Sequence, residues 1–373
     1  MELPFWKRKK TESSSKAQLR ERTGWGTQMS WDLDRGMEKA YESCREKLPI
    51  LDAAITKLVR LTGGFTLKTG SEAMDQALAR DLRTLSCGHG CQGADNFLAA
   101  YLDSLITYGR AVGEMVVRNG QLSALLWGDV TKVRCLESGD PTQTLLASAE
   151  TLEPYPRQEL LLFSVLNPEA AHPYGVSLLR GLPFYADALE TIYRTITRNW
   201  ERAGDVRYSV VCKPDGSGSA QERTRLMAQE WAKAMSPASG GSVTDFVAVG
   251  DVEIRVIGSD AQILDPEVPV RQLLEQVVAK TGLPPFLLGL SWATTERMSK
   301  QQADLLTSEL WALRRAVEPV LSRIGSLWMH LHGLSGAPEI EWTEISLQDL
   351  TEEAHADLYH AQADRLRLEQ EKG

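Results

Sequence analysis

Long apolar runs are absent from this chain of 373 residues. A helix that crosses a bilayer needs roughly 20 consecutive, mostly apolar residues, and no segment approaches that length. The basic segment Lys7–Lys10 is followed by polar residues rather than by the apolar core of a signal peptide. We therefore expect no membrane anchor and no export signal, and a protein that stays in the cytosol where it is made.

Recognisable catalytic motifs are also missing. The sequence holds no Walker loop, no HExxH motif and no GxSxG nucleophile elbow, and its six histidines do not form a ligand set by spacing. The segment Gly175–Ser177 resembles an elbow only superficially, because Leu178 follows where the motif continues toward a glycine. We therefore expect a protein that is not an enzyme and that needs no cofactor.

Cysteine is scarce and odd in number, with five residues that are mostly scattered. This usage indicates free thiols in a reducing compartment. The exception is Cys87-Gly-His-Gly-Cys91, where two thiols and the imidazole of His89 are zinc-type ligands. A structural zinc ion takes four ligands and no fourth is spaced nearby, whereas the glycines beside His89 suit a plain turn between two helices. We predict the turn and no metal, with Cys87, His89 and Cys91 as the candidates for a metal site.

An excess of positive charge is absent too, since the net charge is −9 and the pI is near 5.4. A protein that binds DNA tightly and reads its sequence normally carries a strongly basic domain, so this class is disfavoured. A conduit through which DNA slides would be hindered by many lysine and arginine contacts, and the composition is compatible with one. An acidic surface that only provides solubility explains the same charge equally well.

The sequence does contain long helical periodicities within an ordinary globular composition, 43% hydrophobic and 24% charged. A helix is predicted at Pro269–Thr281, and Gly282 with the prolines after it ends this helix. A second helix, Ser299–Leu331, repeats apolar residues every three or four positions and would be about 50 Å long if straight. Pro319 inside it removes a backbone donor, so we predict a kink near Arg315–Glu318.

This order of elements resembles the portal proteins of tailed bacteriophages, of the HK97 and SPP1-like type. The matching words are TGLPPFLLG, then SKQQADLLTSEL, then AVEPVLSRI, and the resemblance lies in their order and spacing. Features similar to the family extend from about Asn96 to Leu331. The resemblance implies an α+β fold with an α/β wing, a two-helix stem, a βαββ clip insertion, a long kinked helix and a C-terminal helical crown, assembled as a ring.

The resemblance and the local patterns together predict eight segments. They are a flexible basic arm at 1–28, the first part of the wing at 29–176, a stem helix at 177–203, the clip at 204–258, a stem helix at 259–282, the tunnel loop at 283–300, the kinked wing helix at 301–340 and the acidic crown at 341–373. The crown holds nine acidic and three basic residues, and we predict it to be helical and exposed.

In the wing, helices are predicted at 32–61 with an interruption at Pro49, at 72–85 and at 96–107. An alternating segment after the third helix predicts a β-hairpin that turns at Asn119-Gly120. Strands at 132–136 and 159–165 complete a small sheet that packs on the helices. Glu114 on the hairpin is interpreted as a structural hydrogen-bonding group rather than a catalytic acid.

The first stem helix carries a basic stripe. Ser177 is predicted to cap a helix that runs to about Ala203 and is roughly 40 Å long. Its apolar face is long enough to pack against a neighbour along its whole length. Arg194, Arg198 and Arg202 recur every four residues and could face DNA, an acidic neighbouring subunit or solvent. Solvent or a neighbouring subunit is the favoured interpretation.

The clip is predicted from its own pattern of strands and one helix. Arg207–Lys213 is a strand, Gln221–Met235 is an amphipathic helix, and residues 245–249 and 252–257 form a hairpin through Gly250-Asp251. A module entered and left by two adjacent helices must project from the body of the subunit. We therefore interpret the clip as a docking surface.

The resemblance places the end of the tunnel loop in a DNA channel. Small and hydroxyl side chains there suit sliding contacts, and two cations accompany them. Trp292 either buries against the kinked helix or braces the loop and touches DNA. The candidate channel residues are Ser291, Trp292, Thr294, Thr295, Arg297 and Lys300.

As a function, the resemblance implies a ring of about twelve copies at one capsid vertex, through which double-stranded DNA is packaged, retained and ejected. The packaging ATPase, which is the terminase large subunit, and then a head-tail adaptor would dock on it. Further implied partners are the major capsid and scaffold proteins, with assembly in the bacterial cytoplasm and a final location in the virion. The alternatives are another virion or adaptor structural protein, or a nucleic-acid processing enzyme, which would need paired carboxylates that the sequence does not supply.

Overall fold

The structure, a computed structural model, describes residues 36–88, 90–137, 144–204, 207–212, 252–257, 265–290 and 296–345, with isolated positions between 222 and 229. The predicted arm at 1–28 and nearly all of the crown at 341–373 lie outside these residues. The chain divides into two compact units. Unit 1 comprises residues 1–187 and 273–373, and unit 2 comprises residues 188–272.

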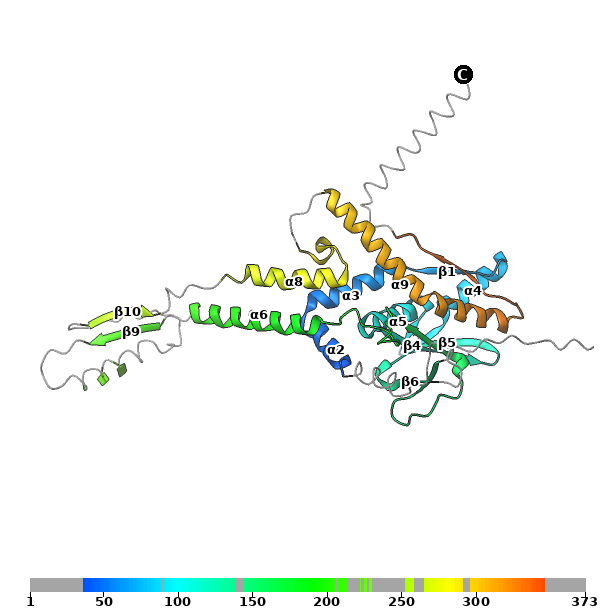
Figure 1. Cartoon of the computed structure of the whole chain (residues 1–373), viewed down its shortest axis with the longest axis horizontal. Helices are drawn as coiled ribbons and strands as arrows, with labels where there is room; N and C mark the ends of the chain where they lie inside the picture. The colour runs from blue at the N-terminus through cyan, green and yellow to red at the C-terminus, as the bar shows by residue number, and fades with distance from the viewer. Residues whose placement is uncertain are drawn as a thin grey trace, which may run out of the picture. The chain divides into compact units, whose positions relative to one another are not determined.

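Unit 1 contains a five-stranded sheet with the order β3-β2-β5-β4-β8 (Figure 1). Its longest strands, β4 (Arg110–Arg118) and β5 (Gln121–Gly128), form an antiparallel hairpin, and β8 (Leu161–Val165) pairs with the other side of β4. Asn119 and Gly120 have φ values of 52° and 75°, the left-handed conformation that a tight hairpin turn requires. The predicted hairpin and its turn are confirmed.

At one edge of this sheet, β2 (Ser86–Gly88) pairs with β5 and also with β3 (Cys91–Gln92). The prediction of a plain turn between two helices was therefore wrong, because the chain forms a short β-hairpin here. Gly88 and Gly90 near its tip both have positive φ, which suits a tight reversal. Strands of two or three residues are too short to show a periodicity, so the sequence pattern did not reveal them.

Four helices precede or cover the sheet: α2 (Glu38–Lys47), α3 (Pro49–Thr62), α4 (Glu72–Thr84) and α5 (Ala94–Tyr108). They confirm the predicted helices, and Pro49 stands in the first turn of α3, where its missing N–H is not needed. Helix α5 packs directly on β4. The Tyr101 hydroxyl donates to the Ala111 carbonyl at 3.1 Å, and a Cβ on Gly113 would lie only 3.0 Å from the Phe97 ring.

Helix α9 (Glu296–Leu331) runs through Pro319, and its ribbon bends along its length, as the internal proline predicted (Figure 1). The helix begins at Glu296, whereas the tunnel loop was predicted to reach residue 300; that boundary is wrong. The predicted apolar stripe lies in the core of unit 1. Its buried members are Leu306, Leu310, Leu313, Val317, Leu321 and Ile324.

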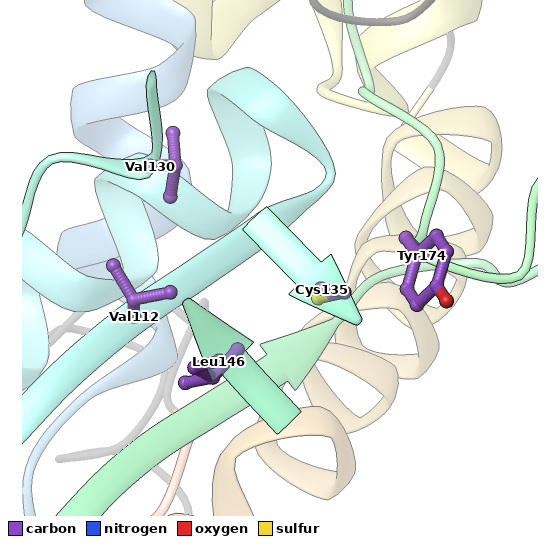
Figure 2. Packing of buried hydrophobic residues seen from close by; sticks show 5 residues of the cluster. All are labelled: Val112, Val130, Cys135, Leu146 and Tyr174. Carbon is purple, nitrogen blue, oxygen red and sulfur yellow. The ribbon is translucent and has the colours of Figure 1, made fainter. Parts of the chain in front are cut away.

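A second small sheet packs against the main one. Strands β6 (Val133–Glu137) and β7 (Thr144–Ser148) form a sheet of two strands, and Ala147 of β7 also forms an isolated bridge with Pro154. The prediction that residues 132–136 and 159–165 share one sheet was wrong. Figure 2 shows the apolar cluster that attaches this hairpin to the rest of unit 1. Its buried members are Val112, Val130, Cys135, Leu146 and Tyr174.

Strand β1 (Phe65–Lys68) pairs with β11 (Glu339–Trp342), with Phe65 opposite Trp342. This pairing joins the beginning and the end of unit 1, and it was not predicted. It also corrects the crown boundary, since Glu341 and Trp342 are strand residues rather than the start of an exposed helix.

Arg314 of α9 ties β11 to the end of α3. Its guanidinium donates to the carbonyls of Thr62, at 2.9 Å, and Thr343, at 2.7 Å, and lies 4.9 Å from the centre of the Trp342 ring. Burial lowers the pKa of Arg314, because removal from water disfavours its charged form. The two carbonyls and the aromatic face offset part of that cost.

Helix α2 is held to the sheet by charges as well as by apolar contacts. Arg110 at the start of β4 binds Glu38 at 2.6 Å, and the two side chains are only 1% and 5% exposed. Arg45 binds Asp103 of α5 at 2.8 Å. The chain thus buries an ion pair beneath the first described helix.

Unit 2 contains most of α6 (Leu182–Gly204), the antiparallel pair β9 (Arg207–Cys212) and β10 (Val252–Ile257), and the start of α8 (Glu267–Thr281). Helix α8 begins two residues before the predicted helix. The pairing of β10 with β9 was not predicted. The predicted hairpin partner at 245–249 and most of the predicted helix at 221–235 lie outside the described residues.

Candidate nucleic-acid interface

Helix α6 carries the candidate interface, and it begins at Leu182 rather than at Ser177. Gly181 has a φ of 91°, which is incompatible with a helix, and Pro183 fits the first helical turn because it needs no backbone partner there. Ser177 is therefore not a helix cap. Its buried hydroxyl donates to the Thr107 carbonyl at 2.6 Å and accepts from the Leu179 N–H at 2.9 Å.

One line of apolar residues runs along α6. At 100° per residue, positions 182, 186, 189, 193 and 200 share one side of the helix. Leu182, Ala186 and Leu189 are buried, whereas Tyr193 is 46% and Trp200 is 65% exposed. The apolar line is therefore covered over the first half of the helix and open over the second half.

The basic stripe lies on the side roughly opposite to this line. Arg194 and Arg198 are both exposed, and exposed Thr191 and Thr195 accompany them. Arg194 forms an ion pair with Glu190 one turn earlier, but 71% of the arginine side chain remains exposed. Such exposed pairs contribute little to stability, so Arg194 keeps donors available for another partner.

Arg202 is the third arginine of the predicted stripe, and only its backbone position is described. Its backbone lies within α6, while its side chain is outside the described residues. Two of the three predicted cations are therefore placed on one solvent-facing side of a helix. Exposed guanidinium groups at one-turn spacing can bind phosphate oxygens without reading base sequence.

The predicted channel residues are placed less completely. Ser291, Trp292, Thr294 and Thr295 lie outside the described residues. Arg297 and Lys300 belong to the first turns of α9, with side chains outside the described set. The described part of the loop is the short 3₁₀ helix η3 (Pro285–Leu288), which ends at Gly289 with a φ of 75°.

The metal candidates do not gain a third ligand. Among the residues that the structure describes, no group of three or more histidine, cysteine, aspartate or glutamate side chains could hold a metal ion. Cys87 and Cys91 lie on the two strands of the β2–β3 hairpin, and His89 between them is outside the described residues. Helices long and apolar enough to cross a membrane are likewise absent from the described part.

The open aromatic end of the α6 line was not predicted. The apolar face of this helix was expected to be able to pack along its whole length, because helical spacing identifies which residues share a side. Spacing carries no information on whether another element covers that side. The signal available in the sequence was the size and aromatic character of Tyr193 and Trp200, which are residues enriched at interfaces.

No family model and no curated protein matches this chain, whereas solved structures do. A chain from the virion of a native gene transfer agent (GTA) particle aligns with a TM-score of 0.60 and 12% identity, over 87% of this chain and 89% of that chain. A chain from the neck of a native GTA particle, computed with C12 symmetry, aligns with a TM-score of 0.56 and 13% identity, over 85% and 89%. The crystal structure of an HK97 family phage portal protein from Corynebacterium diphtheriae aligns with a TM-score of 0.44 and 12% identity, over 80% and 95%.

These matches establish the fold. The two GTA chains align with TM-scores above 0.5 across most of both chains, so this chain has the same mixed helix-and-sheet fold as proteins of phage-like particles. The coarse fold that the resemblance implied, a mixed helix-and-sheet fold shared with proteins of such particles, is therefore confirmed.

Proposed function

We propose that this chain is a portal protein, the subunit of a ring at one vertex of a phage-like capsid, and that double-stranded DNA is packaged, retained and ejected through the ring. The observation that carries the proposal is the fold shared with a chain from a particle neck computed with C12 symmetry. A ring of about twelve copies requires a heterologous, rotationally closed contact between subunits. In this role the protein is structural and catalyses no reaction.

The two sides of α6 support a place for this helix in the ring. The open apolar side, with Tyr193 and Trp200, needs a covering surface, and a neighbouring subunit would supply it. The opposite side, with Arg194 and Arg198, would then face the channel. Few cations on that side suit DNA that must slide, because many strong phosphate contacts would hold it in place.

The module between α6 and α8 is the proposed clip. Its β9–β10 pair would present the surface on which the terminase large subunit docks during packaging and a head-tail adaptor docks afterwards. The major capsid and scaffold proteins would contact the wing. These partners follow from the proposed role.

Electron microscopy of the purified full-length chain tests the assembly. We expect rings with a central hole wide enough for a DNA duplex, and light scattering should give a mass of about twelve chains. A single monomeric species across protein and salt concentrations would contradict the proposal. A closed oligomer without a central hole would support another virion structural protein instead.

The DNA-facing side is tested separately by Arg194→Glu combined with Arg198→Glu. We expect rings of normal mass that package or retain less DNA, because the change places negative charge against phosphates. A matched control is Lys39→Glu combined with Arg60→Glu, which makes the same charge change at exposed positions of α2 and α3. Equal DNA retention in both double variants would remove the basic side of α6 from the channel without removing the ring.

The first turns of α9 offer a second test of the channel. Arg297→Glu combined with Lys300→Glu should leave ring assembly intact and lower DNA packaging or retention. Assembly is measured by light scattering and retained DNA by nuclease protection. Unchanged DNA protection would show that these two cations do not face the channel.

A further inference from the structure

The β2–β3 hairpin holds two cysteines that the proposed function does not use. Its register pairs Ser86 with Gln92 and Gly88 with Cys91, with an irregularity between Ser86 and Gly88. Cys87 is the residue at this irregularity. It is 2% exposed, and its thiol donates a hydrogen bond to the Gly93 carbonyl at 3.0 Å. Cys91 on the partner strand is partly exposed.

The two thiols interact with each other. Burial raises the pKa of Cys87, and the charge and hydrogen bond of the Cys91 thiol raise it further. Both cysteines are free thiols. Gly90 near the tip of the hairpin has a φ of 77°, and a Cβ at this position would meet nothing within 4 Å. Cys87 adjoins Gly88, the residue opposite Cys91, so the two cysteines occupy neighbouring positions across the hairpin. Disulfides usually join residues whose Cα atoms lie about 4.4–6.8 Å apart.

We propose that Cys87 and Cys91 form a redox-active dithiol, which hydroperoxides convert into an intramolecular disulfide. The accessible Cys91 thiolate attacks the peroxide oxygen, so that the O–O bond breaks and an S–O bond forms. After proton uptake, the other oxygen leaves as water from hydrogen peroxide or as an alcohol from an organic hydroperoxide. The Cys87 thiolate then attacks the Cys91 sulfur, which forms the S–S bond and releases the sulfenic oxygen as water after proton uptake. Each sulfur loses one electron to the peroxide, and this inference holds whether or not the chain forms a ring.

The environment of Cys87 gives the second step a pH dependence. Because the thiolate is the attacking species and the pKa of Cys87 is raised, only a small fraction of Cys87 is ionised at neutral pH. Closure of the disulfide should therefore accelerate by up to about tenfold per pH unit as the pH rises above neutrality. The buried Cys44 and Cys135 lie on other elements and should stay reduced under the same treatment.

The test exposes the folded full-length chain to hydrogen peroxide, then unfolds it in N-ethylmaleimide and digests it with trypsin. The peptide Thr84–Arg110 contains Cys87 and Cys91 and no other cysteine. We expect this peptide to escape alkylation, to be lighter by two hydrogen atoms than its reduced form, and to regain two alkylated thiols after dithiothreitol. Two alkylated thiols in the treated sample, or a link from this peptide to another one, would overturn the proposal.

Two variants test the order of the steps. In Cys87→Ala, the sulfenic acid on Cys91 should persist and react with dimedone, because no second thiol resolves it. In Cys91→Ser, Cys87 should remain reduced. Oxidation of Cys87 at the wild-type rate in Cys91→Ser would overturn the assigned roles. Cys91 is only partly buried, so this variant keeps the test decisive even if Cys87→Ala does not fold.

Discussion

Substitution of Glu38 should strongly weaken the attachment of α2 to the sheet, although Glu38 lies close to the first described residue of the chain. The Glu38 carboxylate lies 2.6 Å from the Arg110 guanidinium, and both side chains are at least nine-tenths buried. Glu38→Leu removes this counter-charge and leaves a buried guanidinium. Breaking such a buried pair costs about 3–5 kcal/mol. Glu38→Gln should cost less, because the amide oxygen still accepts a hydrogen bond from Arg110.

The assay must report on α2 itself, since a chain with two units need not unfold in one step. Hydrogen exchange read by mass spectrometry gives the opening free energy of the peptides from α2 and β4. Glu46→Leu is the matched control, because Glu46 lies on the same helix and is exposed. The double variant Glu38→Leu with Arg110→Leu should recover much of the loss. If Glu38→Leu exchanges like Glu46→Leu, or if the double variant loses the sum of the single losses, the ion pair does not hold α2.

Two other predictions concern the core of unit 1. Gly175→Ala should destabilise unit 1 by several kcal/mol in urea unfolding, because a Cβ there would lie 1.9 Å from the Gly109 carbonyl oxygen at a φ of 92°. Gly120→Ala is the control: its φ of 75° is similar but the space around it is open, so it should cost about 1 kcal/mol. Burial raises the pKa of Cys44 to about 11 and that of Cys135 to about 12, so the unfolded chain releases these protons first as the pH rises. Stability should thus fall from about pH 9 to pH 12, by up to about 1.4 kcal/mol per pH unit for each thiol, and Cys44→Ala with Cys135→Ala should flatten this alkaline loss of thermal stability.

The parts of the fold that the sequence predicted are those with a local cause. Pro49 marks the start of α3, Asn119-Gly120 marks the hairpin turn, and the apolar repeat with Pro319 marks the bent helix α9. Each of these signals acts through backbone geometry within a few residues. The boundary at Ser177 failed because a serine before an apolar run fits both a helix cap and a buried anchor, and only the contact with Thr107 decides between them.

The parts that the sequence did not predict depend on distant partners. The pairing of β1 with β11 joins segments more than two hundred residues apart, and no sequence pattern in either segment predicts its partner. Glu38, Arg110 and Arg314 have no feature in the sequence that distinguishes them from surface charges, and their burial follows from the tertiary structure alone. For the candidate interface, spacing correctly grouped Arg194 with Arg198, whereas the openness of the apolar side at Trp200 required coordinates.

The segment that precedes α6 determines how firmly this helix is attached to unit 1. The segment that leads into this helix is bound by backbone hydrogen bonds from Val176 to the Leu166 carbonyl and from Leu178 to the Ile106 carbonyl, and by the near contact of Gly175 with Gly109. Three separate contacts therefore hold this segment. Loss of any one of them should leave the start of α6 attached to unit 1 by the other two.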